Sequence, residues 1–159
     1  MTTAEHGQPT RLTQAPSWLI NQASVYSHRL VAERFAAAGA RGYHYRLLAA
    51  LVEFGPASQA ALGRRTGIDR SDVVAALNEL AAENLVERSP DPVDRRRNVI
   101  TITPAGMRRL EHLDEVLAEI QEALCAPLAP AERDELVRLL TRIVDHHTRI
   151  GRDTVGGEA

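Results

Sequence analysis

Hydrophobic residues recur every three or four positions through most of this 159-residue chain, which is the spacing of amphipathic helices. The first such run starts at Ser17, a good N-cap that follows Pro16, and it ends at Gly39. Pro127 and Pro130 interrupt the pattern near the C-terminus. About six helices are predicted, over residues 17–39, 42–54, 59–65, 70–83, 104–125 and 131–150.

Between the fourth and fifth of these helices the pattern changes to that of strands. The β-branched run 99–103 favours a strand, and residues 85–88 offer it an antiparallel partner. Residues 89–92 should not continue that partner, because two prolines remove backbone donors and fix φ. We therefore predict a two-stranded ribbon with a loop that carries arginines at 95–97. Such a loop suits phosphates and the minor groove of DNA, although a solvated hairpin is the alternative.

The two short helices before the ribbon form a second recognisable unit. Ser58 should cap the first of them, which stops at Gly67, and Asp69 should cap the second with Asp72 as a capping-box partner. Two helices joined by a glycine-containing turn make a helix-turn-helix. Followed directly by the ribbon, this unit becomes a winged helix-turn-helix. DNA binding is the favoured interpretation, and a winged helix that binds a protein partner is the alternative.

Composition supports a mainly α fold with a small β-ribbon. Hydrophobic residues make up 44% of the chain but aromatic residues only 4%, so the core must consist of leucine, valine and alanine. The net charge of −2 is unevenly distributed. Residues 41–109 hold eleven arginines and eight acidic residues, whereas residues 110–159 hold five arginines and eleven acidic residues. One face of the protein should therefore be basic and another acidic.

Several functional classes receive no support from the sequence. A single cysteine, Cys125, excludes an intramolecular disulfide and suits the reducing cytoplasm. No apolar run approaches eighteen residues, so no membrane segment is expected. No nucleotide-binding or zinc-protease motif is present, and His146 and His147 would point about 100° apart on a helix. We predict no enzyme activity, cofactor or metal, and flexible ends at 1–16 and 151–159.

Specific residues of the winged unit resemble the MarR family of bacterial transcription regulators. The resemblance lies in the run 58–71, in 80–88, in the Asp-x-Arg of Asp94 and Arg96, and in Thr103 and Gly106. It implies a triangular homodimer that binds a pseudo-palindromic operator, usually as a repressor released by a small aromatic, phenolic or antibiotic-like effector. Residues 41–103 would form the DNA-binding domain, and 17–40 with 104–150 the helical dimerisation region.

The expected DNA contacts lie on both helices and on the wing. Arg70 should contact base edges at the start of the recognition helix, and Arg64 and Arg65 should contact phosphates. On the wing, Asp94 should orient the guanidinium of Arg96 for the minor groove, with Arg95 and Arg97 toward phosphates. The full set is Ser58, Gln59, Arg64, Arg65, Arg70, Ser71, Asp72, Asn78, Asp94, Arg95, Arg96 and Arg97.

The resemblance also implies an effector pocket between the first two helices and the helix after the wing. Its candidate lining residues are Trp18, Tyr26, Arg29, Tyr43 and His44. A redox-responsive regulator that uses Cys125 is a further alternative, although a buried interface thiol is the simpler interpretation of this residue.

Overall fold

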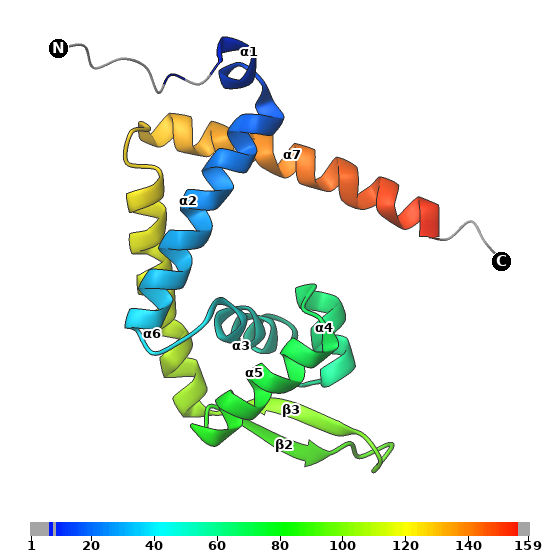
Figure 1. Cartoon of the computed structure of the whole chain (residues 1–159). Helices are drawn as coiled ribbons and strands as arrows, with labels where there is room; N and C mark the ends of the chain where they lie inside the picture. Colours follow the sequence, from blue (N-terminus) through cyan, green and yellow to red (C-terminus); the bar gives the residue numbers. More distant parts are fainter. Residues whose placement is uncertain (1–6, 8, 156–159) are drawn as a thin grey trace. The chain divides into compact units, whose positions relative to one another are not determined.

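A computed structural model describes residue 7 and residues 9–155, and within them it contains seven helices and three strands (Figure 1). The chain divides into two compact units, Met1–Gln121 and Glu122–Ala159. The helices are α1 (Thr10–Thr13), α2 (Pro16–Ala37), α3 (Gly42–Phe54), α4 (Gln59–Thr66), α5 (Arg70–Ala82), α6 (Pro104–Leu124) and α7 (Pro130–Val155). The strands are β1 (Ala57–Ser58), β2 (Val86–Pro90) and β3 (Asn98–Ile102). This confirms the mainly α fold with a small β-ribbon.

The ribbon is part of a three-stranded antiparallel sheet in the order β1-β3-β2. Strand β2 pairs with β3 from Val86 opposite Ile102 to Pro90 opposite Asn98. The prediction that the strand stops before Pro90 is wrong, because β2 is an edge strand and an edge position tolerates a missing backbone donor. The predicted two-stranded ribbon is present as β2 and β3, and β1 adds a third strand. Strand β1 has only two residues, too few to leave a pattern in the sequence.

The core of the first unit is made of aliphatic side chains from every element around the sheet. Helices α3, α4 and α5 lie side by side above the strands in Figure 1, and each contributes leucines that are fully buried. The largest completely buried side chains are Leu47, Leu48, Leu62, Leu77, Leu80, Ile100, Leu113 and Ile120. Their burial removes apolar surface from water and fixes the helix-turn-helix on the sheet.

Thr103 joins the wing to α6. Its backbone N–H donates to the carbonyl of Leu85 (3.1 Å), and its hydroxyl donates to the carbonyl of Asn84 (2.7 Å). The same hydroxyl accepts from the N–H of Gly106 (3.0 Å) and so caps α6. A Cβ on Gly106 would lie 2.1 Å from the carbonyl oxygen of Leu85, so only glycine fits here. Asn84 adopts the left-handed conformation expected of it, with φ 57°.

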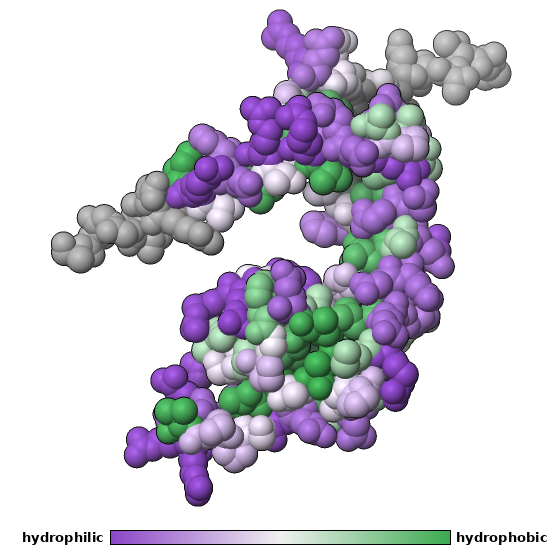
Figure 2. Space-filling view, turned by 180° about the vertical axis from the view of Figure 1, so that it is seen from behind, coloured by the Kyte–Doolittle hydropathy of each residue, from purple (hydrophilic) through white to green (hydrophobic). Residues whose placement is uncertain are grey.

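The second unit consists mainly of α7. Arg133 anchors the start of this helix through an ion pair with Glu122 (2.6 Å) and a hydrogen bond to the carbonyl of Leu128 (3.2 Å). Among the side chains of α7 that are described, up to Ile150, none is buried. Figure 2 shows apolar residues at the surface among hydrophilic ones along this helix, at upper left. Its exposed large hydrophobic residues are Leu136, Val137, Leu139, Leu140, Ile143, Val144 and Ile150.

The ends of several helices differ from the predictions. Residues 10–13, expected to be flexible, form α1, and α7 continues to Val155 rather than ending near 150. Helix α2 begins at Pro16, so Ser17 is inside the helix and does not cap it. Asp69 precedes α5 as expected but makes no side-chain capping bond, so the predicted capping box with Asp72 is wrong. The remaining residues of the two predicted flexible ends, 1–6, 8 and 156–159, lie outside the described residues.

Candidate nucleic-acid interface

The helix-turn-helix forms because each junction is satisfied locally. The Ser58 hydroxyl accepts from the N–H of Ala61 (3.2 Å), which caps α4 as predicted. Gly67 ends α4 in the left-handed conformation with φ 64°, and its N–H donates to the carbonyl of Gly63 (2.9 Å). Helix α5 then starts at Arg70, three residues later. The geometry places the exposed first turn of α5, with Arg70 and Ser71, beside α4.

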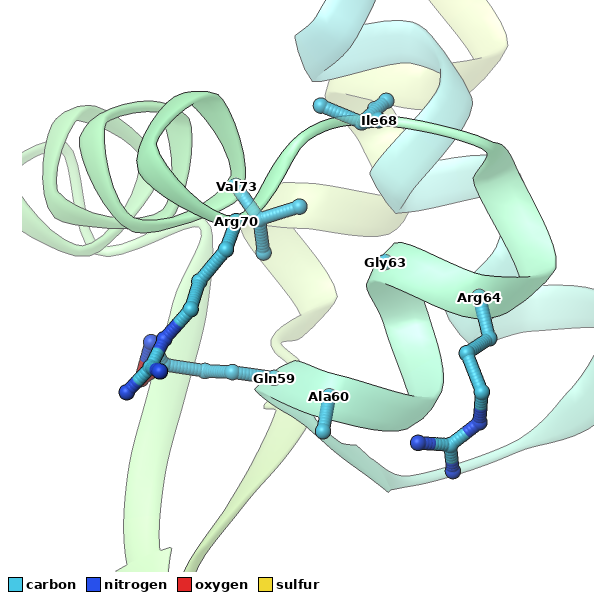
Figure 3. A pocket seen from close by; sticks show the side chains of 7 residues that line it. All are labelled: Gln59, Ala60, Gly63, Arg64, Ile68, Arg70 and Val73. Atoms are coloured by element: carbon cyan, nitrogen blue, oxygen red, sulfur yellow. The ribbon is translucent and has the colours of Figure 1, made fainter.

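A pocket of about 570 Å³ lies between α4 and α5 (Figure 3). Its apolar lining comes from small and aliphatic residues, and its polar groups are Gln59, Arg64 and Arg70. In Figure 3 the side chains of Gln59, from α4, and Arg70, from α5, extend to the same side of the pocket. Guanidinium and amide groups at such a rim can bind phosphates or the acceptor groups of bases. The structure therefore brings together three of the residues predicted to contact DNA.

A second pocket of about 330 Å³ lies at the root of the wing. It is lined by Ser58, Gln59, Ala60, Arg64, Arg97 and Asn98. Because Gln59, Ala60 and Arg64 line both pockets, one basic surface extends from the wing across α4 to the start of α5. The N-terminus of α4 opens onto it and adds partial positive charge. This arrangement suits a run of phosphates better than a single small anion.

The wing tip is a closed turn, not an extended loop. The N–H of Asp91 donates to the carbonyl of Arg97 (2.8 Å), and the N–H of Arg97 donates to the carbonyl of Asp94 (2.9 Å). A carboxylate oxygen of Asp91 accepts from the N–H of Val93 (2.8 Å), an Asx-type contact. Because these bonds hold the tip in shape without the side chains of Arg95 and Arg96, those two guanidiniums stay available.

The prediction that Asp94 orients the guanidinium of Arg96 is wrong. Asp94 accepts a hydrogen bond from the backbone N–H of Arg96 (3.1 Å), but its ion pair is with Arg97, whose Nε lies 3.6 Å from Oδ2. The reason is the turn, which brings residues three apart together, whereas the prediction assumed an extended loop. The carboxylate therefore orients Arg97 and leaves the side chains of Arg95 and Arg96 exposed.

Two other residues from the predicted set contact side chains of the same chain at its surface. The Arg65 guanidinium lies over the ring of Phe54, 5.1 Å from its centre, so Arg65 does not join Arg64 at the pockets. The Asn78 side-chain oxygen accepts a hydrogen bond from Arg88 of β2 (2.6 Å) and ties the recognition helix to the wing. Neither contact has a sequence signal, because the partners belong to different elements.

A polar cluster that sequence reasoning missed links α3 to α5. His44 is buried, and its Nε2 lies 2.6 Å from a carboxylate oxygen of Glu79. Arg41 donates to both oxygens of the same carboxylate (2.9 and 2.8 Å). The hydrogen bond from His44, together with the charge of Arg41, lowers the pKa of Glu79, although burial acts in the opposite direction. These residues are 35 to 38 positions apart, which explains why no local pattern revealed them.

The residues predicted to contact an effector are not gathered into one site. Tyr26 and Arg29 are exposed on α2, Trp18 is half-buried on the same helix, and Tyr43 packs partly buried against the core. Both ring nitrogens of His44 are engaged, by Arg41 and by Glu79. None of these residues lines the two pockets described above, nor two further pockets of the second unit, which are lined by side chains within residues 128–149. Cys125 is half-buried just after α6.

Two further observations concern membrane segments and metal sites. In the described part of the chain, no helix is both long and apolar enough to cross a bilayer. Nor do those residues include a group of three histidine, cysteine or acidic side chains placed to hold a metal ion.

The fold and the basic surface define a winged helix-turn-helix protein, and comparisons with known proteins agree. The HTH-type transcriptional repressor NicR of Pseudomonas putida is 33% identical over 104 residues, which are 65% of this chain and 66% of that protein. The match thus spans just under two thirds of the relative's length. A crystal structure described as a probable transcriptional regulator from Pseudomonas aeruginosa is 32% identical, with a TM-score of 0.73, over 84% of this chain and 99% of that one.

A third similar protein is BpsR of Bordetella bronchiseptica, whose DNA binding is regulated by 6-hydroxynicotinic acid. It is 26% identical, with a TM-score of 0.74, and the match covers 87% of this chain and 99% of that one. A family model described as the MarR family matches residues 39–97, from within the α2–α3 connection to the wing tip. The chain belongs to the MarR family. Its class is therefore that of DNA-binding transcription regulators, which are not enzymes.

Proposed function

We propose that this protein is a sequence-specific repressor that binds a pseudo-palindromic operator in the cytoplasm as a homodimer. The observation that carries this proposal is the continuous basic surface from Arg97 through Arg64 to Arg70. Residues 41–103 form the DNA-binding domain in this proposal. Arg70 and Ser71 enter the major groove, and Arg95 and Arg96 reach the adjacent minor groove.

A second copy of the chain is the partner that the C-terminal helix requires. The apolar residues of α7 are exposed along its length, and those of α2 include Leu19, Ile20 and Val25. Apolar patches of this extent are rarely left open to water. A two-fold dimer formed by residues 17–40 and 104–150 places two recognition helices about one DNA turn apart.

A small aromatic or phenolic effector is the proposed release signal. The relative BpsR supports it, because its DNA binding responds to 6-hydroxynicotinic acid. Trp18, Tyr26 and Arg29 on α2 supply aromatic surface and a cation for such a molecule. His44 is a weaker candidate, because Glu79 and the backbone of Arg41 occupy its two nitrogens.

The experiment is a selection of duplexes by the wild-type protein from a random library, followed by affinity measurements over a range of salt concentrations. We expect an enriched inverted repeat and an affinity that falls steeply with salt, because bound phosphates release counterions. No enriched sequence, or a flat salt dependence, would favour the protein-interaction alternative.

Two adjacent arginines provide a matched pair for the same assay. Arg64 lines both pockets, whereas the Arg65 guanidinium packs over Phe54. Arg64→Ala should weaken binding to all sequences and reduce the salt slope by about one. Arg65→Ala should leave the slope unchanged. Equal losses for the two variants would show that α4 contributes only diffuse positive charge.

A further inference from the structure

In the polar cluster of Arg41, His44 and Glu79, the first two residues contact the recognition helix, α5, through the Glu79 side chain. Glu79 is nine residues after Arg70, and nine residues correspond to about 180° around an α-helix. The cluster therefore contacts α5 on the side opposite Arg70, which faces the pocket between α4 and α5. A rotation of α5 that moved the Glu79 carboxylate would displace Arg70 in the opposite direction.

The hydrogen bonds of the cluster are directional. The backbone N–H of Arg41 donates to Nδ1 of His44 (3.2 Å), so Nδ1 carries no proton and Nε2–H must be the donor to Glu79. His44 is thus a hydrogen-bond donor that the N–H of Arg41, the N-cap residue of α3, holds in one orientation. Its side chain is only 8% exposed, and it is the one buried polar side chain in the described core. A donor fixed this firmly specifies where the carboxylate must lie.

Apolar packing alone does not specify the rotation of α5 about its own axis as closely. The buried face of α5 consists of Val73, Ala76, Leu77 and Leu80. Aliphatic contacts are not directional, and cores tolerate small shifts that preserve volume. The Glu79 carboxylate, which receives two hydrogen bonds from Arg41 at the N-cap of α3 and one from His44 in its first turn, adds the missing angular constraint.

We infer that Arg41, His44 and Glu79 are positioning residues that set the rotation of the recognition helix and thereby the discrimination between operator and non-operator DNA. This inference rests on the proposed DNA binding. Phosphate contacts tolerate small displacements, whereas bidentate contacts with base edges do not. Loss of the cluster should therefore reduce specificity more than it reduces affinity for random DNA.

The test compares two variants with opposite charge changes, Glu79→Ala and Arg41→Ala. Each is measured on the duplex that the wild-type protein selects and on a scrambled duplex of the same composition. We expect both variants to lower the ratio of operator to scrambled affinity about tenfold, the discrimination carried by one good base contact. The ratio does not depend on the folded fraction, so a loss of stability alone would not change it.

Two controls complete the design. Glu83→Ala removes another α5-linked carboxylate, which pairs with Arg109 at 2.7 Å and is 46% exposed against 45% for Glu79, and it should leave the ratio unchanged. Glu79→Gln keeps one acceptor oxygen and should recover part of the loss.

If the cluster only contributes charge near DNA, Glu79→Ala should strengthen binding to both duplexes and Arg41→Ala should weaken it, with the ratio constant. That result would overturn the inference and leave the proposed function intact. A wild-type protein that selects no sequence would instead overturn the proposed function.

Discussion

The winged body and helix α7 bury their aliphatic residues to very different degrees. In the body, Leu77 and Leu80 of α5 are 0% and 1% exposed, whereas in α7 Leu140 and Ile143 are 39% and 45% exposed. Both helices carry leucine at helical spacing, so spacing alone does not explain the difference. The body surrounds its leucines with a sheet and with side chains of helices α2–α6 of the same chain.

The difference indicates in which part of the fold the apolar side chains are covered by the same chain. The core of the body is closed by residues of one chain, so it should be stable without a partner surface. Helix α7 presents an apolar face that its own unit does not cover, and in the proposed homodimer a second copy covers it. Stability of the body should depend on intrachain packing, and stability of the α7 region should depend on protein concentration.

The largest expected effect tests this difference with one substitution made in each region. Leu77→Ala should destabilise the body by about 2–5 kcal/mol, because it leaves a cavity at a fully buried site. The loss should appear at every protein concentration in urea unfolding. Leu140→Ala should lower the midpoint mainly at low concentration, where the dimer dissociates. A concentration-independent loss for Leu140→Ala would contradict the comparison.

A charge on α7 should separate assembly from folding. Ile143→Asp should raise the dimer dissociation constant by at least about 100-fold, since an unpaired carboxylate buried at an interface costs several kcal/mol. Sedimentation velocity measures this directly, and hydrogen exchange should show the α5 amides of the monomer still protected. The control is Thr141→Asp, which lies about 160° away around the helix and should leave the dimer intact. Dissociation by both variants would point to a general charge effect.

A smaller effect concerns the two serines that the sequence offers as helix caps. Ser58→Ala should cost about 1 kcal/mol, because its hydroxyl holds the N–H of Ala61 at the start of α4. Ser17→Ala should change stability by less than about 0.5 kcal/mol, since Ser17 is inside α2 and not at its cap. Thermal unfolding of the two variants beside the wild type checks the difference. Equal costs would mean that α2 starts two residues later than observed, with Ser17 as its N-cap.

The smallest effect is the pH dependence of two carboxylates, one in each region. The pKa of Glu79 is lowered by the bond from His44, and that of Glu135 on α7 is lowered by hydrogen bonds from Arg138. A lowered pKa means that each group stabilises the fold fully above its ordinary value of 4.5. That contribution is lost as the pH falls through the lowered folded value.

Acid unfolding can tell these two carboxylates apart. Glu79→Gln should flatten the pH profile of the body below about pH 4.5. Glu135→Gln should have less influence, because its ion pair joins neighbouring turns of one exposed helix. A steeper profile for Glu79→Gln than for the wild type would mean that the carboxylate destabilises the body.

Much of this fold follows from local chemistry that the sequence displays. Gly42–Phe54 was predicted to the residue, and Ser58, Gly67 and Asn84 mark their junctions as expected. Local rules fail where the deciding contact lies in another segment, and also at the wing tip. There, hydrogen bonds from the Asp91 N–H to the Arg97 carbonyl and from the Arg97 N–H to the Asp94 carbonyl close a turn that pairs Asp94 with Arg97.

The candidate interface shows the same division between local and distant contacts. Arg64 and Arg65 are neighbours on α4 with identical side chains, so sequence gives them one role. Phe54, eleven residues before Arg65, gives its guanidinium an aromatic face to cover, while Arg64 stays at the pockets. The Glu79 cluster likewise depends on the packing of α3 against α5, which no single segment encodes.

The hydrogen bonds of Thr103 fix the register of the two wing strands and so fix where the wing tip begins. Strand β3 cannot slide along β2 by one residue, because the shift would remove Thr103 from the Leu85 and Asn84 carbonyls and turn Ile100 away from the core. The strand that carries the tip is thus pinned at its far end, where α6 begins. Insertions or deletions between residues 91 and 97 must then change the reach of the tip itself. Loop length, rather than strand register, becomes the quantity that can vary when such a wing adapts to a groove of different width.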